Sequence, residues 1–254
     1  MSDYTPGISR RAVRLALEIH ARVPVLPRSL FAKGIVGPHH HIWFTCRNTL
    51  PDTELLFQSA FVSKILDPSY IVRVLWVYEE DNRLLSVVDK VNENMESLSQ
   101  WRNRSNPSSA TRIRVMLEVA KAVRYVHSMG IILHDAVDSD DIFLDSEFHA
   151  RFRFLGLTAH YINVTLIGDL NHEWLSREAN IFLFGCLFYE MCFDVKISYR
   201  NRLENNSDAV AKRPSKPEIR DDEWQLIQRC CAKEPKSQPT MDEVVREMEA
   251  WPGI

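Results

Sequence analysis

The run from Ile181 to Phe193 constrains the fold of this chain more than any other segment, because nearly all of its residues are apolar. Glu190 is its charged exception. The run is shorter than the ~18–20 residues that a helix needs to span a bilayer. A helix that is apolar on all sides has to be buried by other parts of the chain. The sequence therefore predicts a buried core helix over 179–193 in a globular protein.

The hydrophobic pattern changes character near residue 92. Before this point, the runs 71–78 and 84–91 are rich in β-forming residues and flank a polar turn at 79–82, which predicts a hairpin. A helix over 52–66 is predicted to precede it. The later predicted helices cover 113–127, 179–193, about 224–231, and a stretch that begins after a capping box at Thr240 and Glu243. A β-rich unit followed by a helical one predicts an α+β, two-lobed fold.

Composition and charge exclude several classes of protein. The net charge of −3 gives no basis for binding nucleic acid. The five cysteines lack metal-ligand spacing, and four of them lie in apolar helical patterns, which is typical of buried thiols in a reducing compartment. The polar N-terminus carries no secretory or transit signal. We therefore expect a cytoplasmic protein without a membrane span.

Several segments, in the same order along the chain, resemble parts of the eukaryotic protein-kinase domain. Gly130–Asp145 has the outline of the catalytic-loop pattern H-R-D-L-K-x-x-N-I-x-L-D, and Phe184–Met191 is similar to the central-helix pattern S-F-G-C-L-x-Y-E. The lead-in at Leu26–Phe31 is similar to that of tyrosine-kinase-like proteins of mushroom-forming fungi. The other matching segments are Asp67–Leu75, Val88–Val91 and Cys231–Met241.

The resemblance implies one kinase-like domain with two lobes. Residues 26–91 would form a reduced, β-rich N-lobe, and residues 92–254 would form a mainly helical C-lobe. Residues 1–25 would be a helical extension in front of them. The hinge, which contacts the nucleotide in this family, would be formed by Val88, Asp89, Lys90 and Val91.

The catalytic loop has lost most of the side chains that transfer phosphate in this family. With His134 aligned and no gap, Ala136 stands at the general base and Asp138 at the phosphate-facing lysine. Asp141 takes the place of the metal-binding asparagine, and Phe154 that of the metal-binding aspartate. A methyl group cannot accept a proton, and a single carboxylate leaves most metal ligands to ATP itself. We therefore expect no catalytic residue and one candidate metal ligand, Asp141.

A second alignment of the same loop stays open. If Leu133 takes the histidine position, Asp135 becomes the general base, and one extra residue is absorbed before the next strand. Asp140 or Asp141 would then bind the metal. This alignment keeps an acidic base but supplies neither the lysine of the third strand nor a second metal ligand.

The phosphate-binding parts of the N-lobe are degenerate as well. Gly34–His41 has two glycines where the resemblance requires a glycine-rich loop. Thr45 or Cys46 stands in place of the lysine that orients the phosphates, and 57–62 offers no acid to pair with it. We therefore expect no bound cofactor, with ATP and Mg²⁺ as the alternative.

Two anchoring positions differ from the family pattern. The central-helix aspartate that anchors the catalytic loop is Asn180, which still accepts a hydrogen bond from the loop in this interpretation. The arginine of the C-lobe that pairs with a glutamate near the activation segment is Gln238, and that glutamate is missing too. Because both members of this pair are missing, no unpaired buried charge is expected at Gln238.

Two functions are consistent with these substitutions. The first is a catalytically inactive protein kinase-like protein, a pseudokinase, that acts in signalling as a binding or scaffold module for protein partners. Its candidate surfaces include a basic helix over 9–21 and the polar segment over 200–220. A chain without a selected role is a variant of this hypothesis. The alternative is an ATP-binding or weakly active Ser/Thr/Tyr protein kinase that uses the rearranged loop.

Overall fold

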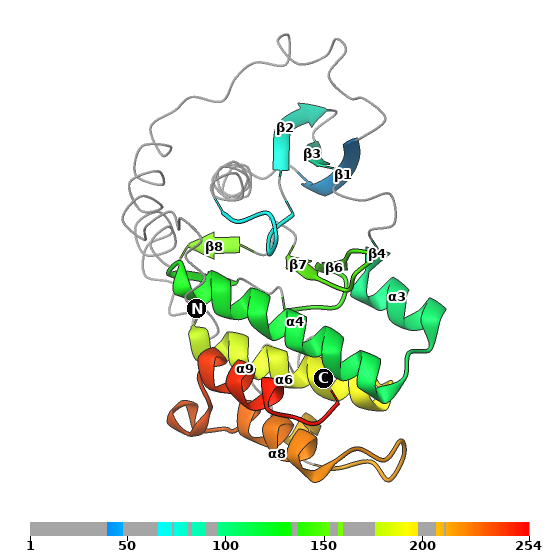
Figure 1. Cartoon of the computed structure of the whole chain (residues 1–254). Helices are drawn as coiled ribbons and strands as arrows, with labels where there is room; N and C mark the ends of the chain where they lie inside the picture. Colours follow the sequence, from blue (N-terminus) through cyan, green and yellow to red (C-terminus); the bar gives the residue numbers. More distant parts are fainter. Residues whose placement is uncertain are drawn as a thin grey trace, which may run out of the picture.

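The two parts of the fold that the sequence predicts are both visible in the computed structural model. It describes residues 40–47, 66–72, 74–80, 83–89, 96–133, 137–152, 157–159, 176–197, 207–210 and 212–253. In Figure 1, a three-stranded sheet lies at one end, the helices gather at the other, and short strands lie between them. The β-rich part precedes the helical part, as an α+β fold requires. The predicted helix over 9–21, nearly all of that over 52–66, and Leu26–Phe31 lie outside the described residues.

The three-stranded sheet is antiparallel and has the order β1-β3-β2. Its strands are β1 (His40–Arg47), β2 (Val74–Glu80) and β3 (Arg83–Asp89). Strands β2 and β3 form the predicted hairpin, with Val77 opposite Ser86. The pairing continues to Glu80 and Arg83, so β2 extends into the segment 79–82 that was predicted as the turn.

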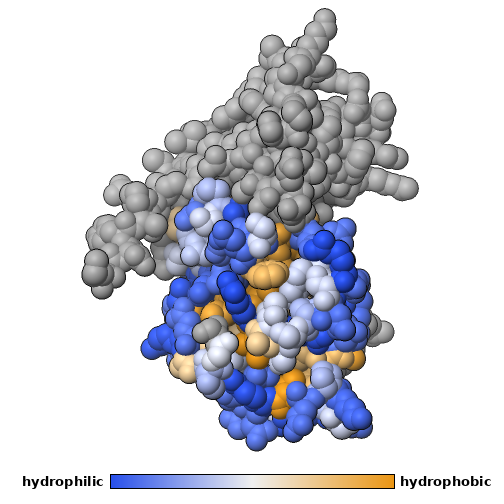
Figure 2. Space-filling model, turned by 45° about the vertical axis from the view of Figure 1, so that its right-hand side comes forward, coloured by the Kyte–Doolittle hydropathy of each residue, from blue (hydrophilic) through white to orange (hydrophobic). Residues whose placement is uncertain are grey.

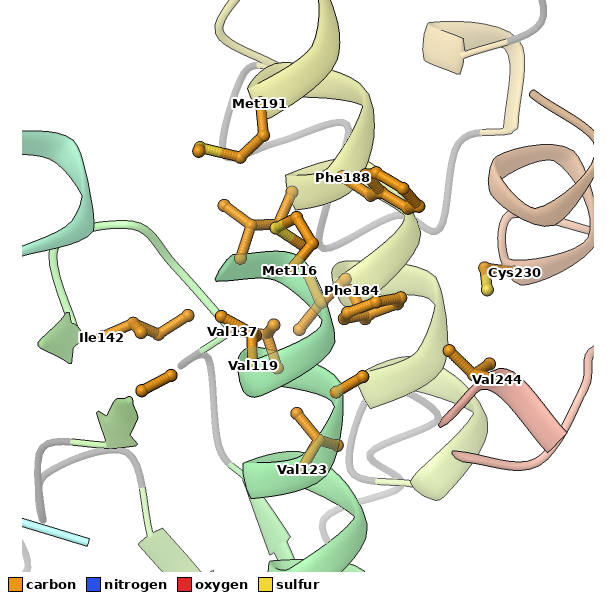
Figure 3. Packing of buried hydrophobic residues seen from close by; sticks show 14 of the residues in the cluster. Met116, Val119, Val123, Val137, Ile142, Phe184, Phe188, Met191, Cys230 and Val244 are labelled. Atoms are coloured by element: carbon orange, nitrogen blue, oxygen red, sulfur yellow. The ribbon is translucent and has the colours of Figure 1, made fainter. Parts of the chain in front are cut away.

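Helix α6 (Arg177–Phe193) is the centre of the helical part. Each of its residues from Ala179 to Phe193 is buried, which confirms the prediction of a core helix. It packs against α4 (Ser109–Ser128) on one side and α8 (Asp221–Cys230) on another, and α9 (Met241–Glu249) packs on α4. Figure 3 shows Val119 of α4 and Cys230 of α8 on different sides of α6.

Gly185 lets α6 and α8 approach one another closely. A Cβ atom at this position would lie 2.5 Å from the Sγ of Cys231 and 2.8 Å from the Cβ of Cys230. Both cysteines are buried, so neither side chain has solvent to move into. The glycine of the central-helix pattern therefore has a packing role in this chain.

Short strands and one further helix connect the sheet to the helices. Strands β4 (Glu96–Ser97), β6 (Ile142–Leu144) and β7 (Ala150–Phe152) form one small sheet, and β5 (Ile131–Leu133) pairs with β8 (Leu157–Ala159). Helix α3 (Leu98–Ser105), which is not among the predicted helices, begins with a capping box formed by Ser97 and Gln100 and buries only Leu98 and Trp101.

The segment 66–72 is fastened to the helical part of the molecule. Val72 N donates to Phe152 O, Phe152 N donates to Tyr70 O, and Asp67 N donates to Tyr125 Oη at 2.7 Å. The rings of Tyr70 and Tyr125 stack with their centroids 4.7 Å apart. This segment therefore extends the helical core up to the start of the three-stranded sheet.

The surface of the described part is mainly polar. Figure 2 shows a largely hydrophilic face on which smaller hydrophobic areas are scattered. Among the described residues, Val195 is the large apolar side chain left exposed. The polar segment predicted over 200–220 contains a 3₁₀ turn at Ser207–Val210, in which Val210 is buried. No helix in the described ranges has the length and apolar character to cross a membrane.

Candidate functional site

The loop between β5 and β6 is the place where the sequence puts the catalytic residues. Its described part runs from Val137 to Asp141. His134, Asp135 and Ala136 lie outside the described residues, as do Phe154, Lys90 and Val91. The choice between Ala136 and Asp135 at the base position therefore stays a prediction. The geometry of the site comes from the second half of the loop and from its supports.

Asp138 closes a tight turn within the loop. Its Oδ1 accepts a hydrogen bond from Asp140 N at 3.1 Å and from Ser139 Oγ at 3.3 Å, and its carbonyl oxygen accepts from Asp141 N at 3.0 Å. An aspartate that bonds to the backbone two residues ahead is a common turn-forming arrangement. At the position where the resemblance implies a lysine, the chain therefore has a carboxylate that accepts hydrogen bonds from the next two residues.

The turn is attached to the first residues of α3. Ser99 N donates to Ser139 O at 3.1 Å, and Ser99 Oγ donates to the Asp140 carboxylate. Ser97 Oγ lies 3.0 Å from Ser99 Oγ, so the N-terminal residues of α3 form one small network with the turn. Ser139 is buried in this contact. These bonds attach the second half of the loop to α3.

The two candidate metal ligands have different surroundings. Asp140 is exposed and accepts from Ser99, whereas Asp141 is half-buried and directly precedes β6. The described residues contain no group of three or more His, Cys, Asp or Glu side chains that could hold a metal ion. Any metal at Asp141 would therefore need ligands from outside the described part or from a nucleotide.

Asn180 of α6 fixes the end of β5, where the loop begins. Its Nδ2 donates to Leu133 O at 2.7 Å, and its Oδ1 accepts from Leu133 N at 2.9 Å. The sequence predicted an acceptor at this position, and the structure adds the donor. Because Asn180 is fully buried, the two bonds satisfy backbone groups that water does not reach.

His127 of α4 completes this support. Its Nε2 lies 3.1 Å from the Oδ1 of Asn180, and because that oxygen can only accept, Nε2 carries the proton. Burial lowers the pKa of His127, and the nearby Arg177 guanidinium lowers it further, while the bond to Asn180 acts in the opposite direction. Arg177 Nη2 also donates to His127 O at 3.0 Å. The imidazole is therefore neutral at pH 7.

The hinge positions are described only in part. Val88 and Asp89 are the last two residues of β3, opposite His41 and His40 of β1. The first two residues of the predicted hinge therefore belong to the antiparallel sheet. Whether Val88–Val91 contact a nucleotide stays a prediction.

A pocket of about 520 Å³ lies elsewhere in the molecule. It is bordered by Tyr70, Glu118 and the turn of the β6–β7 hairpin, and none of its lining residues belongs to the predicted site. Asp145 in its wall accepts from Glu147 N, His149 N and Arg151 Nη2. Burial tends to raise the pKa of Asp145, but the donated hydrogen bonds outweigh it and lower the value. The Asp145 carboxylate therefore receives its hydrogen bonds from its own hairpin.

Residues 53–248 match the family described as "Protein kinase domain". Proteins named "Dual serine/threonine and tyrosine protein kinase" are similar to this chain. The one from Apis mellifera is 27% identical over 169 residues, which are 58% of this chain and 17% of that protein. The one from Xenopus laevis is 25% identical over 238 residues, or 82% and 24% of the two chains. The chain thus spans about a quarter of these relatives or less.

These relatives come from animals, as does the protein of the same name from Tetraodon nigroviridis, which is 24% identical over 246 residues. The predicted similarity to proteins of mushroom-forming fungi therefore stays a prediction.

Proposed function

Because the chain belongs to the protein kinase domain family, we propose that it is a kinase-like binding module that does not transfer phosphate. The observation that carries this proposal is the turn at Asp138. Where the family pattern has a lysine that faces the phosphate, this chain has a carboxylate bonded to Ser139 and Asp140. Asp140 and Asp141 add two more carboxyl groups to the same turn, and their negative charge opposes the approach of a nucleoside triphosphate.

The missing groups account for most of the catalytic rate in such enzymes. Loss of a general base typically costs about 10²–10⁴ in rate, and loss of an electrostatic stabiliser costs about 10²–10³. In the gapless alignment, the general base is replaced by Ala136. The electrostatic stabilisers are missing as well, because Phe154 replaces a metal ligand and Thr45 or Cys46 replaces the lysine of the third strand. Such losses do not simply add, but together they leave little acceleration.

The residues present do not fit a bound ATP–Mg²⁺ complex. Asp141 is one carboxylate, and Phe154 offers no oxygen where the family has its second metal ligand. Asp138 adds a negative charge to the same loop. Phosphate transfer from ATP is therefore not part of the proposed function.

A thermal-shift experiment with ATP, with and without Mg²⁺ or Mn²⁺, tests this proposal. A ligand at 100 times its Kd adds about 2.7 kcal/mol to stability, which raises the melting temperature of a domain of this size by roughly 5–10 °C. We expect no metal-dependent change at millimolar ATP. A shift of several degrees that requires the metal contradicts the proposal.

The Asp141→Ala variant is the matched control for any shift that is seen. A metal-dependent shift that disappears in this variant places the nucleotide at the degenerate site. A shift that persists in the variant, or that occurs without metal, points to binding through the hinge or elsewhere on the chain.

The alternative function is an active Ser/Thr/Tyr kinase, the activity that the names of the relatives state for those proteins. Under this hypothesis Asp135 is the base, and Asp140 or Asp141 holds the metal. Transfer of radiolabelled phosphate that Asp135→Asn abolishes, and Asp141→Ala does not, supports the alternative alignment. Absence of transfer from the unmodified chain, with several metals and peptide substrates, supports the inactive module.

Protein partners are part of the proposal, and the basic helix over 9–21 is one candidate surface. Charge reversal at Arg10, Arg11 and Arg14 in the full chain changes this face without truncating the protein. Partners that bind by charge should be lost from the variant in a pull-down at low salt. Unchanged partners exclude this helix as the docking surface.

A further inference from the structure

The pocket beside the β6–β7 hairpin has walls from three separate segments of the chain. Ser69 and Tyr70 form one wall, Glu118 of α4 forms the second, and the hairpin from Asp145 to Arg151 forms the third. Its volume of about 520 Å³ is within the range of pockets that bind ligands in proteins. The pocket is therefore large enough for a side chain of a partner together with part of its backbone.

The wall at Tyr70 is held in place by α4 and β7. Phe152 N donates to Tyr70 O at 2.9 Å, and Asp67 N donates to Tyr125 Oη at 2.7 Å. The Tyr70 ring stacks on Tyr125 with the centroids 4.7 Å apart, and Tyr70 also borders the pocket. An aromatic ring in such a position attracts a cationic side chain. Because the ring is already fixed, a ligand loses less entropy by ordering it.

The hairpin wall contains one balanced carboxylate and one exposed carboxylate. The Asp145 side chain is 10% exposed and pairs with the guanidinium of Arg151 at 3.1 Å. The Glu147 side chain is 77% exposed, and its carboxylate lies 3.9 Å from His149 Nδ1, which is beyond hydrogen-bond distance. Glu147 is therefore the acidic group of this wall that a ligand can reach.

Glu118 adds a second carboxylate on the α4 wall. Its Oε1 accepts from Lys121 Nζ at 2.9 Å, and its side chain is 20% exposed. Lys121 Nζ also lies 3.7 Å from Glu249, so its positive charge is shared between two carboxylates. Glu118 and Glu147 therefore give the pocket an excess of negative charge, which favours a cationic ligand.

The cation that fits this pocket is organic. No group of three or more His, Cys, Asp or Glu side chains in the part of the chain that the structure describes is placed to hold a metal ion. A guanidinium group pairs with carboxylates and also packs against an aromatic ring. We propose that the pocket binds an arginine side chain from a basic segment of a protein partner. The inference rests on the proposed binding function and names the surface and the chemistry of the partner.

Fluorescence anisotropy with a labelled peptide that alternates glycine and arginine tests the proposal on the full chain at low salt. Glu147→Gln and Glu118→Gln remove a charge and keep the shape of the side chain. Each should weaken binding about two- to fivefold, as for other exposed ion pairs. Glu218→Gln is the matched control, because Glu218 is exposed and does not line the pocket. Its affinity for the peptide should equal that of the unmodified chain.

A second peptide, with citrulline in place of arginine, keeps the shape of the side chain but not its charge. It should bind more weakly than the arginine peptide by at least the same factor. Equal binding of the two peptides, equal affinity of Glu147→Gln and Glu218→Gln, or no binding by the unmodified chain at millimolar peptide overturns the proposal.

Ser69→Arg covers the case in which Glu118→Gln fails to fold. Ser69 is exposed and lines the pocket, so the variant places a positive charge in the wall without disturbing the core. It should abolish measurable binding of the arginine peptide, and unchanged binding contradicts the proposal. None of these results involves ATP. A metal-dependent thermal shift with ATP would therefore overturn the proposed inactive function and leave the pocket in place.

Discussion

The core around α6 and the loop that it supports differ in what they have retained from the family pattern. In the core, the glycine and the apolar residues of the pattern are present, and α6 is buried along its length. In the loop, Asp138 and Asp141 stand where the pattern has a lysine and an asparagine, and Asp138 accepts a hydrogen bond from Ser139. Packing depends on shape and volume, whereas phosphate transfer depends on particular polar groups. The difference between the two regions is what the proposed inactive module requires: a conserved type of core below a loop with altered polar groups.

The largest effect on stability is expected when a side chain is removed from the core. Phe188 is fully buried and packs against Phe184 and Trp251. Phe188→Ala should lower the free energy of unfolding by about 3–5 kcal/mol. The measurement is urea unfolding, with Val195→Ala as the exposed control, for which we expect a change within about 0.5 kcal/mol. Similar small effects for both variants would show that the core is not tightly packed.

Gly185→Ala tests the close contact of α6 and α8. The added methyl group meets Cys231 Sγ and Cys230 Cβ at 2.5 and 2.8 Å, so we expect a loss of about 1–3 kcal/mol from overpacking. The double variant Gly185→Ala, Cys231→Ala should regain part of the loss because the nearer sulfur is removed. A stabilising effect of Gly185→Ala alone, as expected for an open helix position, would contradict the packing role.

The buried His127 should make the free energy of unfolding depend on pH, which tests the support of the loop separately from the packing of the core. Because the folded pKa of His127 lies below its usual value of 6.5, the folded chain binds this proton less readily than the unfolded chain. Stability is therefore fully present above pH 6.5 and falls as the pH drops toward the folded pKa, by up to about 1.4 kcal/mol per pH unit. His127→Gln should remove this component. The measurement is the free energy of unfolding of both chains from pH 5 to 8. The advantage of the unmodified chain over His127→Gln should be larger at pH 8 than at pH 5. A constant difference would contradict a neutral His127.

The smallest effect is expected in the loop. Asp138→Lys restores the residue type of the family pattern and removes the acceptor that Ser139 and Asp140 use. Because these are local bonds at a partly exposed turn, the cost should be about 1 kcal/mol or less. The variant should show no metal-dependent thermal shift with ATP. A gain of nucleotide binding from this change alone would mean that the rest of the site is intact.

Much of the helical part can be predicted from sequence, because burial gives it a regular pattern. Helices α4 and α6 repeat apolar residues over many turns, and α9 begins with a capping box at Thr240 that the structure confirms. Helix α3 was missed because it is short and buries only Leu98 and Trp101. Two buried residues in eight give little periodic signal.

The site is less predictable, because its contacts join residues far apart in the chain. The bond from Ser99 to Asp140 depends on how α3 is placed beside β6, which no local pattern encodes. The donor role of Asn180 depends on Leu133 O facing α6. The sequence shows that Asn180 and Asp138 differ from the family pattern. Which groups they donate to or accept from is seen only in the structure.

Isothermal titration calorimetry of ATP into the unmodified chain, with and without Mg²⁺, tests the central claim most directly. The claim is that the core has kept the kinase fold while the phosphate site has lost its function. We predict no saturable heat from metal-bound ATP at concentrations up to the millimolar range. Stoichiometric binding that requires Mg²⁺ and is lost in Asp141→Ala would contradict it.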